Sequence, residues 1–160
     1  MAKLQLLPVV AALCFALAGV ALATPTFRIQ GRVYCDKCRA GFETSATDYI
    51  EGAKVKLECR QYDTGVVEQT ATAVTDASGT YTLEVEDNHE EEICEVVLVE
   101  SPRPGCSEIM TGRDRARVLI SAESGLTTSV RYANSLGFLN AAPLPECGLL
   151  LQKYALGVDG

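Results

Sequence analysis

Two cysteines only three residues apart, Cys35 and Cys38, constrain the fold of this chain more than any other feature of its sequence. They stand at the end of the stretch FRIQGRVYCDKCR, residues 27–39, in which apolar and polar side chains alternate with the period of a half-buried β-strand. Gly31 lies inside this run, where a missing side chain indicates a bulge or a close approach of another backbone. A strand that ends in two thiols can be bonded to two distant parts of the chain, so we expect it to anchor the fold.

The first 23 residues have the layout of a secretory signal peptide. Lys3 supplies the basic start, an apolar run follows, and Ala21 and Ala23 are the small residues expected just before a cleavage site. We therefore predict cleavage after Ala23 and a mature chain secreted to the extracellular space. No charged residue lies between Lys3 and Arg28, so an uncleaved membrane anchor is the alternative, against which the two small residues argue. No second apolar run approaches the roughly 20 residues that a membrane span requires.

The mature chain, residues 24–160, is long enough for one domain with a substantial core. It holds 13 basic and 21 acidic residues, a formal net charge of −8. This balance speaks against nucleic acid or an anionic membrane as a partner, because recognition of phosphate needs clustered lysines and arginines.

Six cysteines remain after the signal peptide is removed, and in an oxidising compartment we expect them to form three disulfides. They are Cys35, Cys38, Cys59, Cys94, Cys106 and Cys147. Six cysteines allow 15 pairings. Cys35 and Cys38 are too close along an extended chain to pair with each other. Cys59 ends one predicted strand and Cys94 begins another, which suggests a bridge between them and leaves Cys35 and Cys38 to take Cys106 and Cys147 in either order.

Metal and redox sites fit the cysteine spacing less well than structural disulfides do. A zinc site would need a second matched pair, but Cys94 and Cys106 are 12 residues apart and His89 is the only histidine. A thioredoxin-like pair would need a helix that begins at its first cysteine. His89 lies in the acidic stretch 84–92, which lacks the order of a calcium-binding loop and predicts a solvated loop. We predict no metal and no cofactor.

Six further stretches have the composition or alternation of strands: residues 53–60, 66–74, 80–86, 93–99, 117–121 and 127–132. Residues 93–99, ICEVVLV, are apolar on both faces, which predicts a central strand. Gly79 in the stretch 75–79 predicts a hairpin loop, and residues 43–51 predict a polar loop. About seven strands at this spacing favour an all-β fold, a small antiparallel β-barrel or sandwich.

The C-terminal part differs in character. Residues 136–138 and 143–145 predict an extended loop packed on the sheet. The leucines that follow Cys147 predict a short helix, limited to about ten residues by the prolines before it and Gly157 after it. Because so short a helix is not stable alone, we expect a disulfide of Cys147 to hold its apolar side against the sheet.

Residues 31–42, GRVYCDKCRAGF, resemble the signature of the Ole e I family, the olive-pollen-allergen type of plant secreted protein. The resemblance continues through GAKVKLECR, DASGTYTLEVE, ICEVVLVESPRPGCSEI and ANSLGFLNAAPLPECG, and all six mature cysteines fall where that family keeps its six. It implies a small antiparallel β-barrel with the disulfides Cys35–Cys106, Cys38–Cys147 and Cys59–Cys94.

The resemblance also implies a function outside the cell. Proteins of this family are secreted and abundant in pollen, several are allergens, and members are associated with pollen hydration, germination or tube growth without an established catalytic activity. We therefore expect a non-catalytic interaction or signalling protein with an unidentified extracellular protein or cell-wall partner, and we expect it to be an allergen. The family often carries an N-glycan, but no N-x-[ST] sequon occurs at Asn88, Asn134 or Asn140, so we predict no glycosylation.

Two other functions are weighed against this one. With His89 as the sole histidine, no Ser-His-Asp or Cys-His arrangement is evident, and nothing marks two of the many carboxylates as a convergent glycosidase pair. We therefore predict that the protein is not an enzyme. The second alternative is a secreted protease inhibitor, in which the disulfide-held loop 101–106 would present a peptide to a protease.

Overall fold

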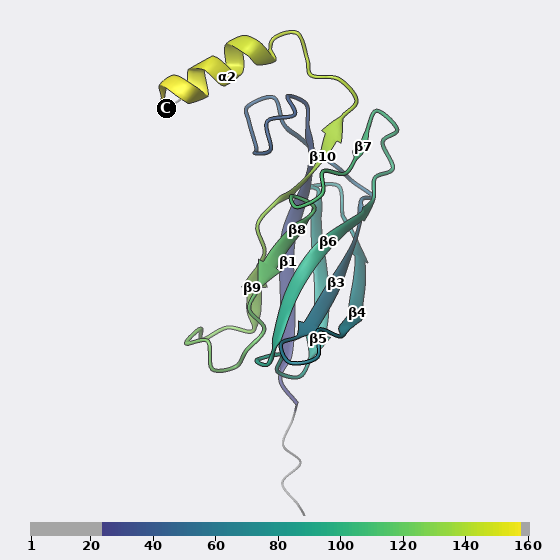
Figure 1. Ribbon diagram of the computed structural model, residues 1–160, viewed down its shortest axis with the longest axis vertical. Coiled ribbons are helices and arrows are strands. Elements are labelled where there is room, and N and C mark those ends of the chain that lie inside the picture. The colour runs from purple at the N-terminus through teal and green to yellow at the C-terminus, as the bar shows by residue number, and fades with distance from the viewer. Residues whose placement is uncertain (1–23, 158–160) are drawn as a thin grey trace, which may run out of the picture.

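The computed structural model describes residues 24–157, and the predicted signal peptide lies outside these residues. Two sheets lie face to face and form an elongated barrel with a short helix at one end (Figure 1). The strands are β1 (Thr26–Asp36), β2 (Asp48–Tyr49), β3 (Lys54–Gln61), β4 (Val67–Val74), β5 (Thr80–Glu86), β6 (Glu92–Glu100), β7 (Cys106–Glu108), β8 (Arg115–Val118), β9 (Val130–Tyr132) and β10 (Leu136–Asn140), and the helix is α2 (Cys147–Leu156).

The predicted anchor strand, β1, is the longest strand and has four partners. Its first part pairs with β5 in antiparallel and with β9 in parallel orientation, whereas its last part pairs with β2 in antiparallel and with β10 in parallel orientation. The all-β prediction is therefore confirmed, with two parallel pairings added to an otherwise antiparallel barrel. Parallel pairings need distant crossover connections, which alternation within one strand cannot reveal.

Gly31 makes room for a ring. It lies opposite Tyr81 of β5, and pairing continues through it without a shift of register, so β1 has no bulge there. A Cβ atom on Gly31 would lie 2.2 Å from the hydroxyl oxygen of Tyr81. The missing side chain therefore allows a close approach, as predicted, but of a side chain rather than of a backbone.

The four-stranded sheet has the order β4-β3-β6-β8, so β6 is an internal strand, as its apolar sequence predicted. Alternate residues of β3 point into the core, where Val55, Leu57 and Cys59 are fully buried. Four predictions of strand and loop positions were wrong. Residues 136–138, expected as a loop, form part of β10, and the strands expected at 117–121 and 127–132 are the shorter β8 and β9. Residues 43–51, expected as a loop throughout, contain β2.

The connection 75–79 is a turn but not the hairpin that we predicted. β4 belongs to the four-stranded sheet and β5 pairs with β1, so the turn leads from one sheet to the other. The carboxylate of Asp76 accepts the N–H groups of Ser78 and Thr80, and Gly79 has a φ of 73°, which favours glycine. The same turn chemistry can therefore close a hairpin or connect two sheets. Only the pairing partners of the flanking strands distinguish the two.

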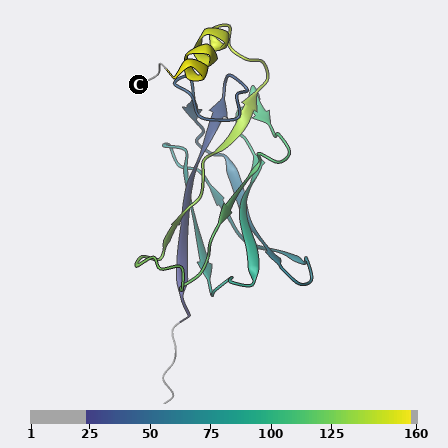
Figure 2. The ribbon, with the colours of Figure 1, turned by 60° about the vertical axis from the view of Figure 1, so that its left-hand side comes forward.

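The helix was predicted to lie against the sheet, and this expectation was wrong. α2 lies beyond the upper end of the barrel, beside the loop that follows β1 (Figure 2). Cys147 is its only buried residue, and Leu149 and Leu156 are exposed. Within residues 24–157, no helix has the length and apolar character needed to cross a membrane.

Candidate functional site

Two disulfides organise the upper end of the barrel. Cys35, near the end of β1, is bonded to Cys106 of β7, and Cys38, just beyond β1, is bonded to Cys147 of α2. The third disulfide joins Cys59 and Cys94, which lie directly opposite each other in β3 and β6. These are the three pairs that the family resemblance implies. The sequence separations of 71 and 109 residues show that β1 connects the upper end to two distant segments.

The turn after β1 is built on a buried carboxylate. Asp36 is 1% exposed and accepts the backbone N–H groups of Cys38, Ala40 and Gly41 at 3.2, 3.0 and 2.6 Å. Three such bonds satisfy the carboxylate without a cationic partner and hold the chain in the turn that leads away from β1. This role was not predicted from the sequence, although aspartate commonly forms turns because its carboxylate accepts backbone N–H groups a few residues further along the chain.

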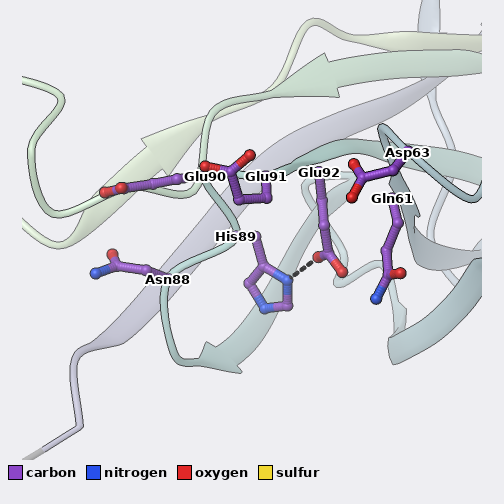
Figure 3. A pocket seen from close by; sticks show the side chains of 7 residues that line it. All are labelled: Gln61, Asp63, Asn88, His89, Glu90, Glu91 and Glu92. Carbon is purple, nitrogen blue, oxygen red and sulfur yellow. Dashed lines mark hydrogen bonds and ion pairs between the residues drawn. The ribbon is translucent and has the colours of Figure 1, made fainter.

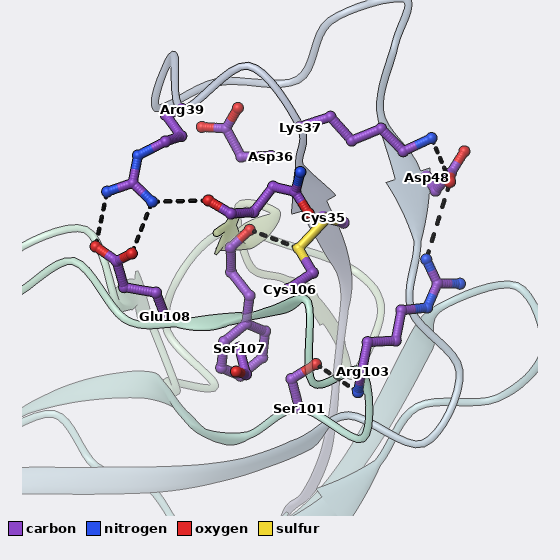
Figure 4. Close-up of a disulfide and its surroundings, with 12 residues drawn as sticks. Cys35, Asp36, Lys37, Arg39, Asp48, Ser101, Arg103, Cys106, Ser107 and Glu108 are labelled. Atoms are coloured by element: carbon purple, nitrogen blue, oxygen red, sulfur yellow. Dashed lines mark hydrogen bonds and ion pairs between the residues drawn. A yellow bond between two sulfur atoms is a disulfide. The ribbon is translucent and has the colours of Figure 1, made fainter. Parts of the chain in front are cut away.

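An ion pair ties the same turn to β7. The guanidinium of Arg39 donates to both carboxylate oxygens of Glu108 at 2.7 Å and to the carbonyl of Asn140 at 2.7 Å (Figure 4). The hydrogen bond with Glu108 raises the pKa of Arg39, and the same bond lowers the pKa of Glu108. The contact fixes the position of the turn relative to the Cys35–Cys106 disulfide.

We call α2 and the loop 37–47 the cap. Tyr154 of α2 packs edge-on against Phe42 with ring centroids 5.6 Å apart, and its hydroxyl accepts the N–H of Ser45 at 2.9 Å. On the other side of the helix, Leu149 is 72% and Leu156 is 69% exposed. The cap therefore presents two exposed leucines on a helix that is held in place by one disulfide and a few contacts.

A hollow of about 470 Å³ lies between the cap loop and the segment before β10. Its lining consists of Tyr34, Gly41, Phe42, Glu43, Ala133, Asn134 and Ser135. Burial, followed by the charges of Asp36 and Glu43, raises the pKa of Tyr34 to about 12. The Tyr34 hydroxyl is therefore protonated at neutral pH and can act as a hydrogen-bond donor but not as a base.

The lower end of the barrel carries the acidic turn between β5 and β6, which borders a pocket of about 530 Å³. The pocket is lined by Gln61, Asp63, Asn88, His89, Glu90, Glu91 and Glu92 (Figure 3). His89 Nδ1 contacts the carboxylate of Glu92, and its Nε2 lies 3.2 Å from the carbonyl oxygen of Glu86. Glu90 and Glu91 are exposed, as expected of a solvated loop, but the side chains of His89 and Glu92 are only 15% and 14% exposed.

The lower turn is fastened to the loop that follows β8. The Ser121 hydroxyl donates to Glu90 at 2.6 Å, and Asn88 accepts the N–H of Ala122 at 2.8 Å. The backbone N–H of His89 donates to the carbonyl of Ile120 at 3.0 Å. His89 is therefore held in one place by the backbone as well as by its ring.

Neither end has the geometry of a hydrolase among the described residues. The ring of His89 is engaged with Glu92 and a carbonyl group rather than with a hydroxyl nucleophile. Three carboxylates converge on the outer face of the four-stranded sheet, but each lies within 4.0 Å of the Arg115 guanidinium; they belong to Glu58, Glu95 and Asp114. These side chains therefore form an ion-pair network around one guanidinium.

The loop considered as an inhibitory loop is folded onto its own barrel. The guanidinium of Arg103 donates to the carbonyl of Tyr49 at 2.9 Å and lies 3.9 Å from the Asp48 carboxylate. The N–H of Arg103 donates to the hydroxyl of Ser101, as Figure 4 shows. A loop that enters a protease must project its central side chain outward, so these contacts disfavour that role.

Comparison with known proteins places this architecture among plant proteins. The family model described as "Pollen protein Ole e 1 like" matches residues 25–155. The "Pollen-specific protein C13" of Zea mays is 55% identical over 81% of this chain and 76% of its own length. The "Major pollen allergen Lol p 11" of Lolium perenne is 50% identical over 81% of this chain and 98% of its own.

A more distant relative and a solved structure agree with these matches. The "Anther-specific protein LAT52" of Solanum lycopersicum is 42% identical over 91% of each chain. The crystal structure of the major plantain pollen allergen Pla l 1 superimposes with a TM-score of 0.68 at 31% identity, covering 76% of this chain and 99% of that one. The similarity therefore includes the barrel itself and is not limited to the cysteine signature.

Proposed function

The chain belongs to the family of Ole e 1-like pollen proteins, and from this premise we propose that it is a secreted pollen protein that binds an extracellular partner and catalyses no reaction. Relatives are named as pollen-specific, anther-specific or allergenic, which supports a pollen protein of the allergen type. We further propose that binding serves pollen hydration, germination or tube growth, and that the partner is a protein or a component of the cell wall.

The two exposed leucines of the cap are the observation that carries this proposal. Leu149 and Leu156 lie one heptad apart on one face of α2, with the polar Gln152 and Lys153 between them, so the face offers two separate apolar anchors. The disulfide of Cys147 anchors the first residue of the helix to the end of β1. A helix that presents leucines in a fixed position is suited to a groove on a protein partner.

Affinity capture tests the surface directly. Mature protein would be immobilised and exposed to extracts of pollen-tube membranes and walls, beside the double variant Leu149→Ser/Leu156→Ser. Leu126→Ser is the matched control, since Leu126 is 57% exposed in the loop between β8 and β9, at the opposite end. We expect the wild type and the control to retain the same partner and the cap variant to lose it. Equal capture by all three proteins would place the partner surface elsewhere.

Two further measurements examine the parts of the proposal that concern export and catalysis. Mass spectrometry of secreted material should find Thr24 at the N-terminus, and peptides that still carry Lys3 would contradict cleavage after Ala23. The pure protein should leave a panel of proteases uninhibited, because Arg103 is engaged with Tyr49 and Asp48. Inhibition that is lost on Arg103→Ala would favour the inhibitor function instead.

A further inference from the structure

The His89–Glu92 pair lies against the Cys59–Cys94 disulfide at the lower end of the barrel. The two sulfur atoms, a ring nitrogen of His89 and a carboxylate oxygen of Glu92 all lie within 4.8 Å of one another. Zinc binds thiolate, imidazole and carboxylate at about 2.0–2.3 Å in tetrahedral sites, so its ligand atoms lie roughly 3.3–3.8 Å apart. The four atoms therefore need movements of only about an ångström to surround one ion.

The backbone places three of these side chains independently of any metal. Cys59 and Cys94 are direct neighbours across β3 and β6, and Glu92 precedes Cys94 by two residues in the same strand. A spacing of two residues directs Glu92 and Cys94 to the same face of the sheet. The site would thus be largely formed before an ion arrives.

The fourth side chain has the orientation of a metal ligand. Nε2 of His89 lies 3.2 Å from the carbonyl oxygen of Glu86, so the tautomer protonated at Nε2 directs its lone pair at Nδ1 toward the carboxylate of Glu92. Metal-binding histidines usually donate their second N–H to a carbonyl or carboxylate in this way, which fixes the ring and its tautomer. The carbonyl of Glu86 would serve as that acceptor here.

The pocket described above gives an ion access from solvent. His89 and Glu92 line the pocket and also lie close to the sulfur atoms, so an ion that entered the pocket would meet two of the proposed ligands there. Asp63, Glu90 and Glu91 line the same pocket. Their negative charge attracts cations.

We propose that reduction of the Cys59–Cys94 disulfide converts this end of the barrel into a Zn²⁺ site with Cys59, Cys94, His89 and Glu92 as ligands. A dithiol reductant would supply two electrons, breaking the S–S bond and forming two thiols while its own sulfur atoms form a disulfide. Binding of Zn²⁺ then releases two protons as the thiols become thiolates. The disulfide-bonded protein lacks thiolates and so lacks the site, which makes metal binding a consequence of the redox state.

Cobalt is a suitable probe, because Co²⁺ in a tetrahedral thiolate site absorbs strongly in the visible and near-ultraviolet range. The full mature chain would be treated with a limiting amount of a phosphine, which reduces a disulfide and becomes the phosphine oxide. Alkylation and mass spectrometry of an aliquot would identify the fraction in which Cys59 and Cys94 are free, and Co²⁺ and then Zn²⁺ would be added to the matching unalkylated protein. We expect one tetrahedral Co²⁺ per chain, displaced by Zn²⁺, and no such spectrum for the oxidised protein.

Three variants decide whether the proposed ligands hold the ion. His89→Ala and Glu92→Ala should each weaken binding by about tenfold or more. Glu91→Ala removes an equal charge from the same pocket without removing a ligand, so it should bind as the wild type does. Equal affinity in all three variants, an octahedral Co²⁺ spectrum, or equal binding by oxidised protein would overturn the proposal. So would a reduced chain that is unfolded by circular dichroism and does not refold with Zn²⁺.

Discussion

The two ends of the barrel use disulfides in opposite ways. At the lower end, Cys59 and Cys94 lie opposite each other in two strands whose backbones are already hydrogen-bonded. At the upper end, Cys38 and Cys147 join a loop to a helix that otherwise touches the molecule through little more than Tyr154. The lower disulfide is added to existing packing. The Cys38–Cys147 disulfide at the upper end instead substitutes for packing that α2 lacks.

This difference teaches what each end can do. A helix held by one covalent bond can keep leucines exposed, because its position does not depend on burying them. A disulfide inside a sheet can be opened while the backbone pairing around it remains, because hydrogen bonds and core side chains still hold the strands. The cap is therefore suited to presenting a surface, and the lower end to a change of chemistry without a change of fold.

The largest effect is expected in the middle of the barrel, where β5 contacts β1. Tyr81 is fully buried on Gly31, and its replacement by alanine should cost about 3–5 kcal/mol of unfolding free energy through the cavity that it leaves. Tyr81→Phe is the matched control, because the Tyr81 hydroxyl is buried without a hydrogen-bond partner and should contribute little. Chemical denaturation measures both variants. A loss as large for phenylalanine as for alanine would show that the ring's packing is not what matters.

The Cys38–Cys147 disulfide is expected to have the next largest effect. The double variant Cys38→Ser/Cys147→Ser should lose about 2–5 kcal/mol, the range for a native bridge in a small secreted domain. Its α2 should become accessible to proteases, since Cys147 is the only residue that the helix buries.

The lower disulfide provides the comparison. In Cys59→Ala/Cys94→Ala, α2 should stay protected, because nothing at the lower end contacts the cap among the residues described. Limited proteolysis followed by mass spectrometry distinguishes the two variants. A cap that stays protease-resistant without Cys147 would show that contacts other than the disulfide hold it.

A smaller effect is expected at the turn that leads into the cap. Asp36→Ala leaves the N–H groups of Cys38, Ala40 and Gly41 without their acceptor, which should cost about 1–3 kcal/mol. Asp36→Asn keeps one carbonyl oxygen and should lose less. The midpoint of denaturation and the rate of amide hydrogen exchange at Ala40 and Gly41 measure this loss. Equal stability of the alanine variant and the wild type would mean that water replaces the carboxylate.

Local chemistry made β1, β3 and β6 predictable from the sequence, because alternation or a continuous apolar run reports which faces are buried. The helix was predictable in length but not in position. Prolines and Gly157 define its ends, whereas its contacts depend on the loop 37–47, whose path is determined by the buried Asp36. β10 was missed because its partner is a parallel strand about 100 residues away in sequence.

The His89–Glu92–disulfide cluster could not be predicted for a related reason. A zinc site was expected to need a second pair of closely spaced cysteines, but Cys59 and Cys94 are separated by 35 residues and meet only through strand pairing. Their pairing brings Glu92 close by register, and the turn then brings His89. Spacing along the chain reports sites within one turn, and sites that span a sheet appear only once the register is known.

The smallest effect concerns the ion pair that steadies the cap, and it depends on pH. Arg39 holds the pKa of Glu108 below its ordinary value of 4.5. Because the folded-state pKa is the lower one, the contribution of the pair to stability is fully present above pH 4.5 and is lost as the pH falls through the folded-state value. Glu108→Gln should therefore lower the melting temperature slightly at pH 7, and the two proteins should converge as the pH falls below the folded-state pKa of Glu108.

Salt and a second variant separate this ion pair from a general effect of charge. The side chains of Arg39 and Glu108 are 29% and 52% exposed, so added salt should also reduce the difference between wild type and Glu108→Gln. Glu146→Gln is the matched control, because Glu146 is an exposed carboxylate just before α2 that forms no ion pair within residues 24–157. It should change the melting temperature less than Glu108→Gln at pH 7. If both variants behave alike at every pH, the two hydrogen bonds of Arg39 to Glu108 contribute nothing to the stability of the cap, and the Cys38–Cys147 disulfide holds it without their help.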